Sequence, residues 1–280
     1  MAITTAARRP LAQRVPPHAY FVGSAVFHYL GPAFAVLLFA RVGPLGTAWL
    51  RIAAAALVLC AWRQPWPLLR EPILLALGAV LAVMNCCFYL AIDRLPLATV
   101  AAIEFLPVIA LAAIGARTRR NGAALALAVT GVYMLTGIRL AGEPLGIALA
   151  FANAGFFALY IVLSHRVAQA SGLDGLAASM LAALVAVTPL AGWDAVPALD
   201  DPVAIAAGIG VGIASSVIPY VCDQLAMARL QRATYALLVS LLPATATIIG
   251  VVVLGQVPSA QEVAGVALVI GGVAIHRERS

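Results

Sequence analysis

The chain has 280 residues, of which 64% are hydrophobic and only 10% are charged, and its mean hydropathy is +1.03. An average soluble domain is about half apolar and about a quarter charged. This composition therefore excludes an ordinary soluble fold and indicates a protein whose solvent is lipid. The net charge of +6 comes from 17 arginines and no lysine, so its meaning depends on where the arginines lie.

Ten apolar segments are separated by polar or turn-forming residues, and each approaches the roughly 20 residues that a helix needs to cross a bilayer. In chain order, the predicted spans cover residues 18–40, 44–62, 72–91, 97–116, 122–138, 145–164, 174–192, 203–226, 234–254 and 261–276. The polar residues 1–17 lack a small-residue cleavage site after a short apolar core, which predicts a retained tail before an uncleaved first helix. The sequence therefore predicts an all-α membrane protein with ten transmembrane helices.

The arginines between the spans predict the orientation of the chain. With the N-terminus inside, thirteen arginines lie in inner segments and three in outer loops, while Arg51 lies within a span. The inner ones are Arg8, Arg9, Arg14, Arg63, Arg70, Arg117, Arg119, Arg120, Arg166, Arg229, Arg232, Arg277 and Arg279, and the outer ones are Arg41, Arg94 and Arg139. Because cytoplasmic loops carry an excess of basic residues, we expect both termini to be cytoplasmic.

A short phrase occurs twice, about half a chain apart. Arg94-Leu95, Ala98-Thr99 and Leu106-Pro107 reappear as Arg229-Leu230, Ala233-Thr234 and Leu242-Pro243, at offsets of 135 and 136 residues. Such a match is either a chance one in apolar sequence or the mark of two related halves. Since each half holds five spans, an odd number, two related halves would enter the membrane from opposite sides, as inverted repeats do in transporters.

The repeat and the spans together predict the division of the chain. We expect a cytoplasmic N-terminal tail at residues 1–17 and a first five-helix repeat at 18–138. A second, inverted five-helix repeat is expected at 145–276, followed by a cytoplasmic tail at 277–280. Two inverted halves allow one central site to face either side of the membrane in turn.

Two acidic residues lie within predicted spans, each close to a proline. Glu104 stands three residues before Pro107, and Asp223 stands four residues after Pro219. A carboxylate in hydrocarbon is costly and usually faces a cavity or a partner, and a proline frees a backbone carbonyl one turn back. Both acids are therefore candidates for binding a substrate or a proton. The structural alternatives are an anchor between helices for Glu104, and a helix cap or a partner of Arg229 or Arg232 for Asp223.

Polar residues also form stripes on two spans. Asn85 and Tyr89 share one face of the third span, and Ser216 and Tyr220 share one face of the eighth, with Asp223 three residues further on. Stripes that face the interior of a bundle line a cavity. The alternative is bonding between helices, where such side chains contribute about 0.6 kcal/mol each.

Arg51 and His28 are the other ionisable residues within the first two spans. Arg51 lies about 10 Å into its span if that span begins near Pro44. Its long side chain favours snorkelling to the lipid headgroups, and the alternative is contact with a substrate carboxylate. A lone histidine such as His28 more often has a structural role than a proton-carrying one.

Motifs of the common enzyme classes do not occur in this sequence, which contains no HExxH, GxSxG, P-loop or CxxC. We therefore expect no enzyme, no catalytic residues, no metal site and no cofactor. A channel is an alternative to a transporter, but inverted repeats with proline-broken helices favour alternating access.

Several phrases of the sequence resemble one transporter family. They are Met84-Asn85 with Phe88-Tyr89-Leu90, Leu95-Pro96-Leu97, Glu104-Phe105, Pro219-Tyr220 with Asp223, and Ala228-Arg229-Leu230. With ten spans in two inverted halves, the chain resembles the EamA family of the drug/metabolite transporter superfamily, and within it the RhtA-like threonine/homoserine exporters. The resemblance implies a secondary transporter of the bacterial inner membrane that exports small amino acids, driven by proton entry.

The predicted substrate site lies near the bilayer midplane, between the halves. Its residues are Asn85, Tyr89, Glu104, Ser216, Tyr220 and Asp223, and Glu104 and Asp223 are also expected to carry protons. The expected partners are a small-molecule substrate, protons and the lipid bilayer, with no nucleic acid and with a homodimer left open. One alternative is export of another metabolite, or of an aromatic or cationic drug, along Tyr89, Tyr160 and Tyr220. The other is a non-transporting scaffold or sensor.

Overall fold

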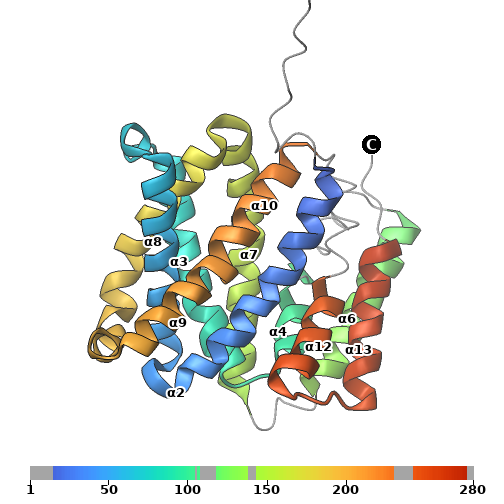
Figure 1. Ribbon diagram of the computed structural model, residues 1–280. Coiled ribbons are helices and arrows are strands. Elements are labelled where there is room, and N and C mark those ends of the chain that lie inside the picture. The colour runs from blue at the N-terminus through green and yellow to red at the C-terminus, as the bar shows by residue number, and fades with distance from the viewer. Residues whose placement is uncertain (1–14, 105, 108–117, 138–142, 230–241, 276–280) are drawn as a thin grey trace, which may run out of the picture.

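The computed structural model describes residues 15–104, 106–107, 118–137, 143–229 and 242–275. Within these ranges every element of secondary structure is a helix (Figure 1), as the sequence predicts. The elements are α2 (Pro17–Arg63), η1 (Trp66–Leu68), α3 (Pro72–Ile92), α4 (Leu97–Glu104), α6 (Arg119–Gly137), α7 (Pro144–Ala170), α8 (Gly172–Ala195), η2 (Val196–Asp200), α9 (Pro202–Gly212), η3 (Ile213–Val217), α10 (Ile218–Met227), α12 (Leu242–Leu254) and α13 (Ala260–Ile275). Both η1 and η2 are 3-10 helices, whereas η3 is a π-helix.

Five helical segments among the described residues are long and apolar enough to cross a membrane. They cover Ala19–Arg63, Pro72–Ile92, Pro144–Ala170, Gly172–Asp200 and Pro202–Met227, and two shorter apolar helices cover Ala244–Leu254 and Ala260–Gly272. The chain is therefore a multi-pass membrane protein. Parts of the fourth and ninth predicted spans, at residues 105, 108–116 and 234–241, lie outside the described residues, and the count of ten crossings stays a prediction.

The longest helix, α2, contains the first two predicted spans, 18–40 and 44–62, on either side of a break. At Gly43 the backbone takes φ 67° and ψ 172°, a conformation that glycine adopts easily because it has no Cβ. Pro44 follows where a new helical stretch begins, so its missing N–H leaves no helical bond unmade. Figure 1 shows the chain turning back at this point, at the lower end of the bundle.

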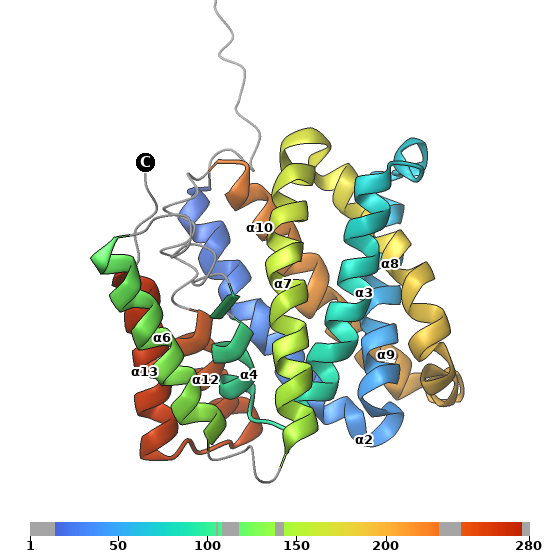
Figure 2. The same ribbon diagram turned by 180° about the vertical axis from the view of Figure 1, so that it is seen from behind.

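The centre of the bundle is occupied by α2, which contacts α8, α9, η3, α10 and α12. The helix α3 lies against both α7 and α8, and α6 lies along α13 (Figure 2). Many contacts therefore join helices of the first predicted repeat to helices of the second, and the two sets interlock. The repeat boundaries and the inverted relation stay predictions, since three of the six matched residues in the second copy of the repeated phrase lie outside the described residues.

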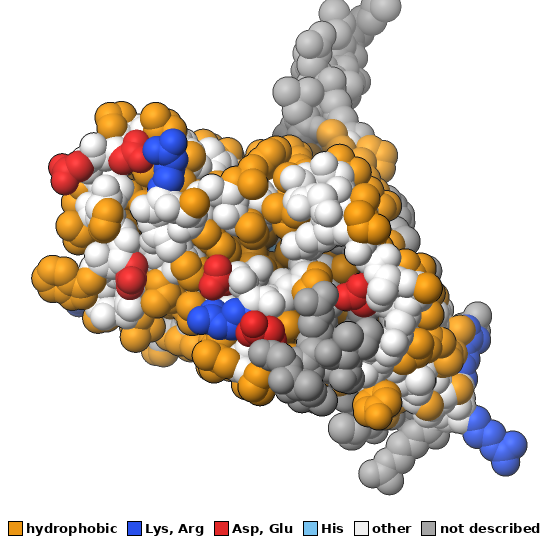
Figure 3. Space-filling view, turned by 90° about the horizontal axis from the view of Figure 1, so that it is seen from below, with side chains coloured by type: hydrophobic (Ala, Val, Ile, Leu, Met, Phe, Trp, Pro, Cys, Tyr) orange, Lys and Arg blue, Asp and Glu red, His pale blue; other side chains and the backbone are white. Residues whose placement is uncertain are grey.

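Charged side chains meet at the two ends of the bundle. At the end where α2 begins and ends, Arg63 binds Asp174 at 2.6 Å, and Arg120 and Arg229 donate to backbone carbonyls. The opposite end, where α2 turns back and Arg41 lies, carries a few charged side chains among many hydrophobic ones (Figure 3). Of the arginines that the structure describes, Arg63, Arg120 and Arg229, predicted to be inner, thus lie at one end, and Arg41, predicted to be outer, lies at the other. Which end faces the cytoplasm stays a prediction.

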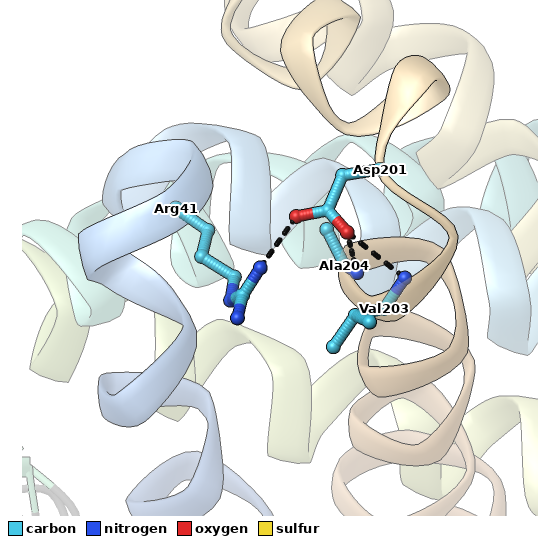
Figure 4. A network of polar contacts seen from close by, with 4 residues as sticks. All are labelled: Arg41, Asp201, Val203 and Ala204. Carbon is cyan, nitrogen blue, oxygen red and sulfur yellow. Dashed lines mark hydrogen bonds and ion pairs between the residues drawn. The ribbon is translucent and has the colours of Figure 1, made fainter.

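Asp201 connects the turn of α2 to the start of α9 (Figure 4). Its carboxylate accepts hydrogen bonds from the backbone N–H groups of Val203 at 2.9 Å and Ala204 at 3.2 Å, and Arg41 donates to its other oxygen at 2.7 Å. Such a residue caps the helix by satisfying donors that have no partner within it. The Arg41 guanidinium and the Ala204 N–H hold the pKa of Asp201 below its usual value.

Candidate functional site

Polar side chains are buried inside the bundle, where most neighbours are apolar. They are Ser24, Thr47, Arg51, Asn85, Thr99, Glu104, Asn121, Asn153, Ser164, Ser179, Ser215, Ser216, Asp223 and Gln224. Because an unsatisfied polar group at membrane depth is costly, these side chains should either bond to one another or serve a ligand. Arg51 and Glu104 stand out, because each is charged and lies at the centre of a group of hydrogen bonds.

Glu104 lies at the end of α4 and is 2% exposed. Its carboxylate accepts hydrogen bonds from the Tyr29 hydroxyl at 3.3 Å and from Asn153 Nδ2 at 2.9 Å. These donors come from α2 and α7, so the acid joins three helices. Both donors are neutral, and none of the ion pairs within the described residues includes Glu104. The carboxyl group is thus held in place by neutral donors and has no contact with a cation among the described residues.

Arg51 lies in the second stretch of α2 and does not reach the headgroups. Only 4% of it is exposed, and the prediction that it snorkels outward is therefore wrong. Its Nε donates to Ser216 Oγ at 2.7 Å, and its Nη2 donates to the backbone oxygen of Ser215 at 2.7 Å and to the Tyr220 hydroxyl at 3.4 Å. These polar partners inside the bundle hold the guanidinium there.

The carbonyl that binds Arg51 is made available by a proline. Pro219 has no N–H, so it cannot donate to the carbonyl of Ser215, four residues earlier, as a helix residue normally would. The chain widens here into the π-helix η3, where the Ile218 N–H bonds to the carbonyl of Ile213, five residues back. Proline chemistry predicted from the sequence thus creates a free backbone acceptor next to the arginine.

A glycine lets this π-helix approach α2. A Cβ added at Gly212 would lie 2.5 Å from the Ala54 Cβ and 2.8 Å from the backbone oxygen of Arg51. Such distances are too short for any side chain, so glycine is required for the close contact. The contact places Ser215 and Ser216 within reach of the Arg51 side chain.

Two tyrosine rings flank the guanidinium of Arg51. Its central carbon lies 5.5 Å from the centre of the Tyr89 ring and 6.0 Å from that of Tyr220, distances typical of cation–π contacts. The predicted stripe of Ser216 and Tyr220 thus meets Tyr89 at one cation. The side chain of Asn85, another predicted site residue, donates from Nδ2 to the carbonyl of Leu81 in its own helix at 2.7 Å. This bond does not connect Asn85 to Arg51.

The groups around Arg51 and Glu104 are adjoining. The His28 ring contacts Tyr29, a Glu104 partner, with ring centres 5.4 Å apart, and lies 6.5 Å from the ring of Tyr220, an Arg51 partner. The charges of Arg51 and Glu104 are also close enough to interact electrostatically. We call the whole group the central site, and it consists of His28, Tyr29, Arg51, Tyr89, Glu104, Asn153, Ser215, Ser216 and Tyr220.

Asp223 lies one turn beyond the central site, in α10. It is 4% exposed, and the Ser24 hydroxyl donates to its carboxylate at 2.5 Å. Arg229 donates to the carbonyl of Val15, and Arg232, the other predicted partner of Asp223, lies outside the described residues. The pairing of Asp223 with an arginine therefore stays a prediction. Since Ser24 and Tyr29 are five residues apart on α2, the two acids contact that helix about 7.5 Å apart along its axis.

The sequence did not identify every member of the central site. Tyr29 and Asn153 were missed, although Asn153 is an amide in an otherwise apolar span and could have been noticed on that ground. Ser215 was missed because its backbone, and not its side chain, makes the contact, although its position four residues before Pro219 was a usable signal. Tyr29 carries no local signal that separates it from other tyrosines.

Two surface hollows lie apart from the central site. A groove of about 640 Å³ is lined by residues of α2, α8 and η2, including Trp49, Thr188 and Trp193. A smaller pocket of about 170 Å³ lies between α4, α12 and α13, next to Thr99, Gln256 and Glu262. No member of the central site lines either hollow. No group of three or more metal-ligating side chains occurs among the described residues.

Comparisons with known proteins place this architecture among transporters. The model of the EamA-like transporter family matches residues 144–276. The threonine/homoserine exporters RhtA of Escherichia coli (strain K12) and Salmonella typhimurium (strain SL1344) are each 32% identical to the chain over 237 residues, which is 81% of this chain and 79% of each exporter. One crystal structure of another protein superposes with a TM-score of 0.61, at 20% identity, over 92% of this chain and 97% of that one, which shows a shared fold.

Proposed function

Because the chain belongs to the EamA family of the drug/metabolite transporter superfamily, and is a membrane exporter rather than an enzyme, we propose that it exports small amino acids such as threonine and homoserine. The proposed location is the inner membrane of a bacterium. The observation that carries the proposal is the Glu104 carboxylate, which is buried among transmembrane helices with two neutral partners. A negative charge held in this way suits the ammonium group of an amino acid.

The surroundings of Glu104 support an ammonium site. An ammonium group has three donors and needs several acceptors around it. Asn153 Oδ1 is buried and has no hydrogen-bond partner within the described part of the chain, while the Nδ2 of the same amide bonds to Glu104. The carboxylate and this amide oxygen would together supply acceptors on one side of the ammonium group. Asp223 supplies a second carboxylate along α2.

Transport would proceed by alternating access between the two predicted repeats. The site uses side chains from α2, α3 and α4 of the first repeat and from α7, η3 and α10 of the second. A substrate that contacts helices of both predicted repeats would change its contacts whenever one repeat moves against the other. Such rocking opens a central site first to one side of the membrane and then to the other.

Proton entry would drive the release of the substrate. A proton taken up by Glu104 from the outer side removes the negative charge that holds the ammonium group, so the substrate leaves outward. Loss of the proton to the inside restores the empty site for the next substrate. Asp223, near the inner end of its predicted span, is the second proposed proton carrier.

The test is pH-driven export of labelled threonine from proteoliposomes. Glu104→Gln keeps the size of the side chain and removes its charge, and we expect it to abolish the response to an imposed pH gradient. The matched control is Glu71→Gln, the same change at an exposed residue before α3, which should leave export unchanged. Export by Glu104→Gln that still follows the pH gradient would overturn the coupling role.

A second cargo class has one observation in its favour. The rings of Phe157 and Tyr160 stack with centres 5.9 Å apart, and Tyr160 lies 5.6 Å from Tyr220. Such a row of rings suits an aromatic or cationic drug. Competition by such a compound, with no competition by threonine or homoserine, would favour this alternative. A scaffold or sensor has no comparable support, since the named relatives are exporters.

A further inference from the structure

The charge of Arg51 is not balanced by an acid in contact with it. Arginine stays protonated in proteins, and an arginine at membrane depth usually pairs with an anion or faces water. Its partners are instead a serine hydroxyl, a backbone carbonyl and a tyrosine hydroxyl. Ten of the eleven acidic residues lie in the described part of the chain, and none of these ten forms an ion pair with Arg51.

The guanidinium of Arg51 is fixed by neutral acceptors alone and therefore keeps its full charge for a further partner. We propose that Arg51, with Ser216 and Tyr220, binds the carboxylate of the exported amino acid, and that the site therefore requires a free carboxylate in its substrate. The inference rests on the proposed function and adds the group by which the substrate is selected. It assigns the two ends of the amino acid to different places, the ammonium group to Glu104 and the carboxylate to Arg51.

The chemistry of the partners allows a carboxylate to enter. A guanidinium offers paired N–H donors that match the two oxygens of a carboxylate. Ser216 now accepts from Nε, but a hydroxyl can also donate, so it can turn and donate to an incoming carboxylate oxygen. The Tyr220 hydroxyl, at 3.4 Å from Nη2, can do the same. The carbonyl of Ser215 cannot donate, and it would continue to hold Nη2 in place.

The geometry also explains why the guanidinium remains ready for an anion. The Ser215 carbonyl and the rings of Tyr89 and Tyr220 fix the plane and position of the guanidinium without neutralising it. An ion pair inside the protein would compete with the substrate, whereas neutral acceptors are replaced more easily. Glu104 lies close enough for its charge to act on Arg51, as expected if the two bind opposite ends of one small zwitterion.

The test compares L-threonine with its amide and with threoninol on the purified protein. The two analogues keep the ammonium group and the side chain but lack the carboxylate. A ligand that binds the folded state raises the melting temperature according to its affinity. For the wild type we expect both analogues to bind at least about tenfold more weakly than threonine, the factor that corresponds to losing one charge-assisted hydrogen bond.

Variants assign the preference to Arg51. Arg51→Gln should bind threonine at least about tenfold more weakly and should lose the preference for threonine over its amide. Arg51→Lys, which keeps the charge, should restore part of that preference, and a purely structural arginine would not change this ratio. Ser216→Ala should weaken threonine binding and leave binding of the amide unchanged. Arg94→Gln, outside the central site, is the matched control and should behave as the wild type.

The outcomes separate this inference from the proposed function. If the wild type binds threonine and its amide equally well, or if Arg51→Gln keeps the preference, the carboxylate assignment is wrong while amino-acid export can stand. If neither threonine nor homoserine binds or is transported by the wild type, the proposed function itself fails. The comparison of ligands on the wild type needs no variant, so it decides the question even if Arg51→Gln does not fold.

Discussion

Two arginines of the same helix show how differently a charge is used at the end and at the centre of this bundle. The side chain of Arg41 is 52% exposed and pairs with Asp201 at 2.7 Å. Arg51, ten residues later in α2, is 4% exposed and bonds to neutral acceptors only. The costly position is therefore the one without a bonded counter-ion. Because a chain does not need such a charge in order to fold, this contrast supports the proposed binding of a substrate anion at Arg51.

The environment of each arginine follows from local backbone structure. Near Arg41, Asp201 stands at the N-terminus of α9, so one carboxylate both caps the helix and pairs with the arginine. Near Arg51, a π-helix and Pro219 leave one backbone carbonyl without its helical donor. At the end of the bundle the arginine thus contacts a charged acceptor, whereas at the centre the groups that accept hydrogen bonds from the arginine are all neutral.

Removing the charge of Arg51 should impair transport, whereas removing the charge of Arg41 should leave transport nearly unchanged. We expect Arg51→Gln to lower threonine counterflow in proteoliposomes at least about tenfold, because the substrate carboxylate loses its charged partner. Its melting temperature should not fall, because a buried charge without a bonded counter-ion is removed. Arg41→Gln should change counterflow less than about twofold, as expected for an exposed pair. A large loss of stability in Arg51→Gln, with transport retained, would show that Arg51 only holds the helices together.

Restoring the missing backbone donor should weaken the site moderately. Pro219→Ala supplies an N–H that can bond to the Ser215 carbonyl and so compete with Arg51 Nη2. We expect threonine affinity to fall about two- to tenfold, the range for one hydrogen bond. Pro189→Ala in α8, a proline inside a helix and outside the central site, is the matched control and should leave affinity unchanged. Equal affinities in the two variants would mean that the freed carbonyl does not position Arg51.

The smallest effect is expected at the end of the bundle. Asp201→Asn keeps a capping side chain but loses the charge that Arg41 binds. Because the pKa of Asp201 is depressed in the folded protein, its charge contributes stability above the ordinary Asp pKa of about 3.9, and that contribution is lost as the pH falls through the lower, folded value. The variant should melt slightly below the wild type at pH 7, and the difference should vanish in acid. A difference that persists in acid would contradict this assignment.

Much of the architecture followed from composition and periodicity. Apolar length predicted where helices lie, and the interruption between the spans 18–40 and 44–62 is the place where the structure turns, at Gly43 and Pro44. Glu104, Tyr89, Ser216 and Tyr220 were identified as candidates since polar groups at membrane depth are rare. The structure brings these four residues together with Arg51. The sequence had instead favoured a side chain of Arg51 that reaches outward to the lipid headgroups.

The rest depended on contacts between distant segments. The path of the Arg51 side chain is decided by Ser215 and Ser216, more than 160 residues away in sequence, and by the close approach that Gly212 permits. Tyr29 and Asn153 gain their roles only because α2 and α7 meet at the end of α4. Local sequence patterns contain no information about which distant helices come into contact. The proline four residues after Ser215 was the one local signal that pointed to the free carbonyl.

The central claim is that this protein moves a small zwitterionic amino acid held at both ends. The most direct measurement is counterflow of labelled L-threonine into proteoliposomes that hold wild-type protein and are preloaded with unlabelled L-threonine. We predict that these liposomes accumulate more labelled threonine than protein-free liposomes do. An excess of homoserine should abolish this accumulation, and the same concentration of threonine amide should not. Wild-type liposomes that accumulate no more threonine than empty ones, or accumulation that the amide blocks as well as homoserine does, would contradict the account.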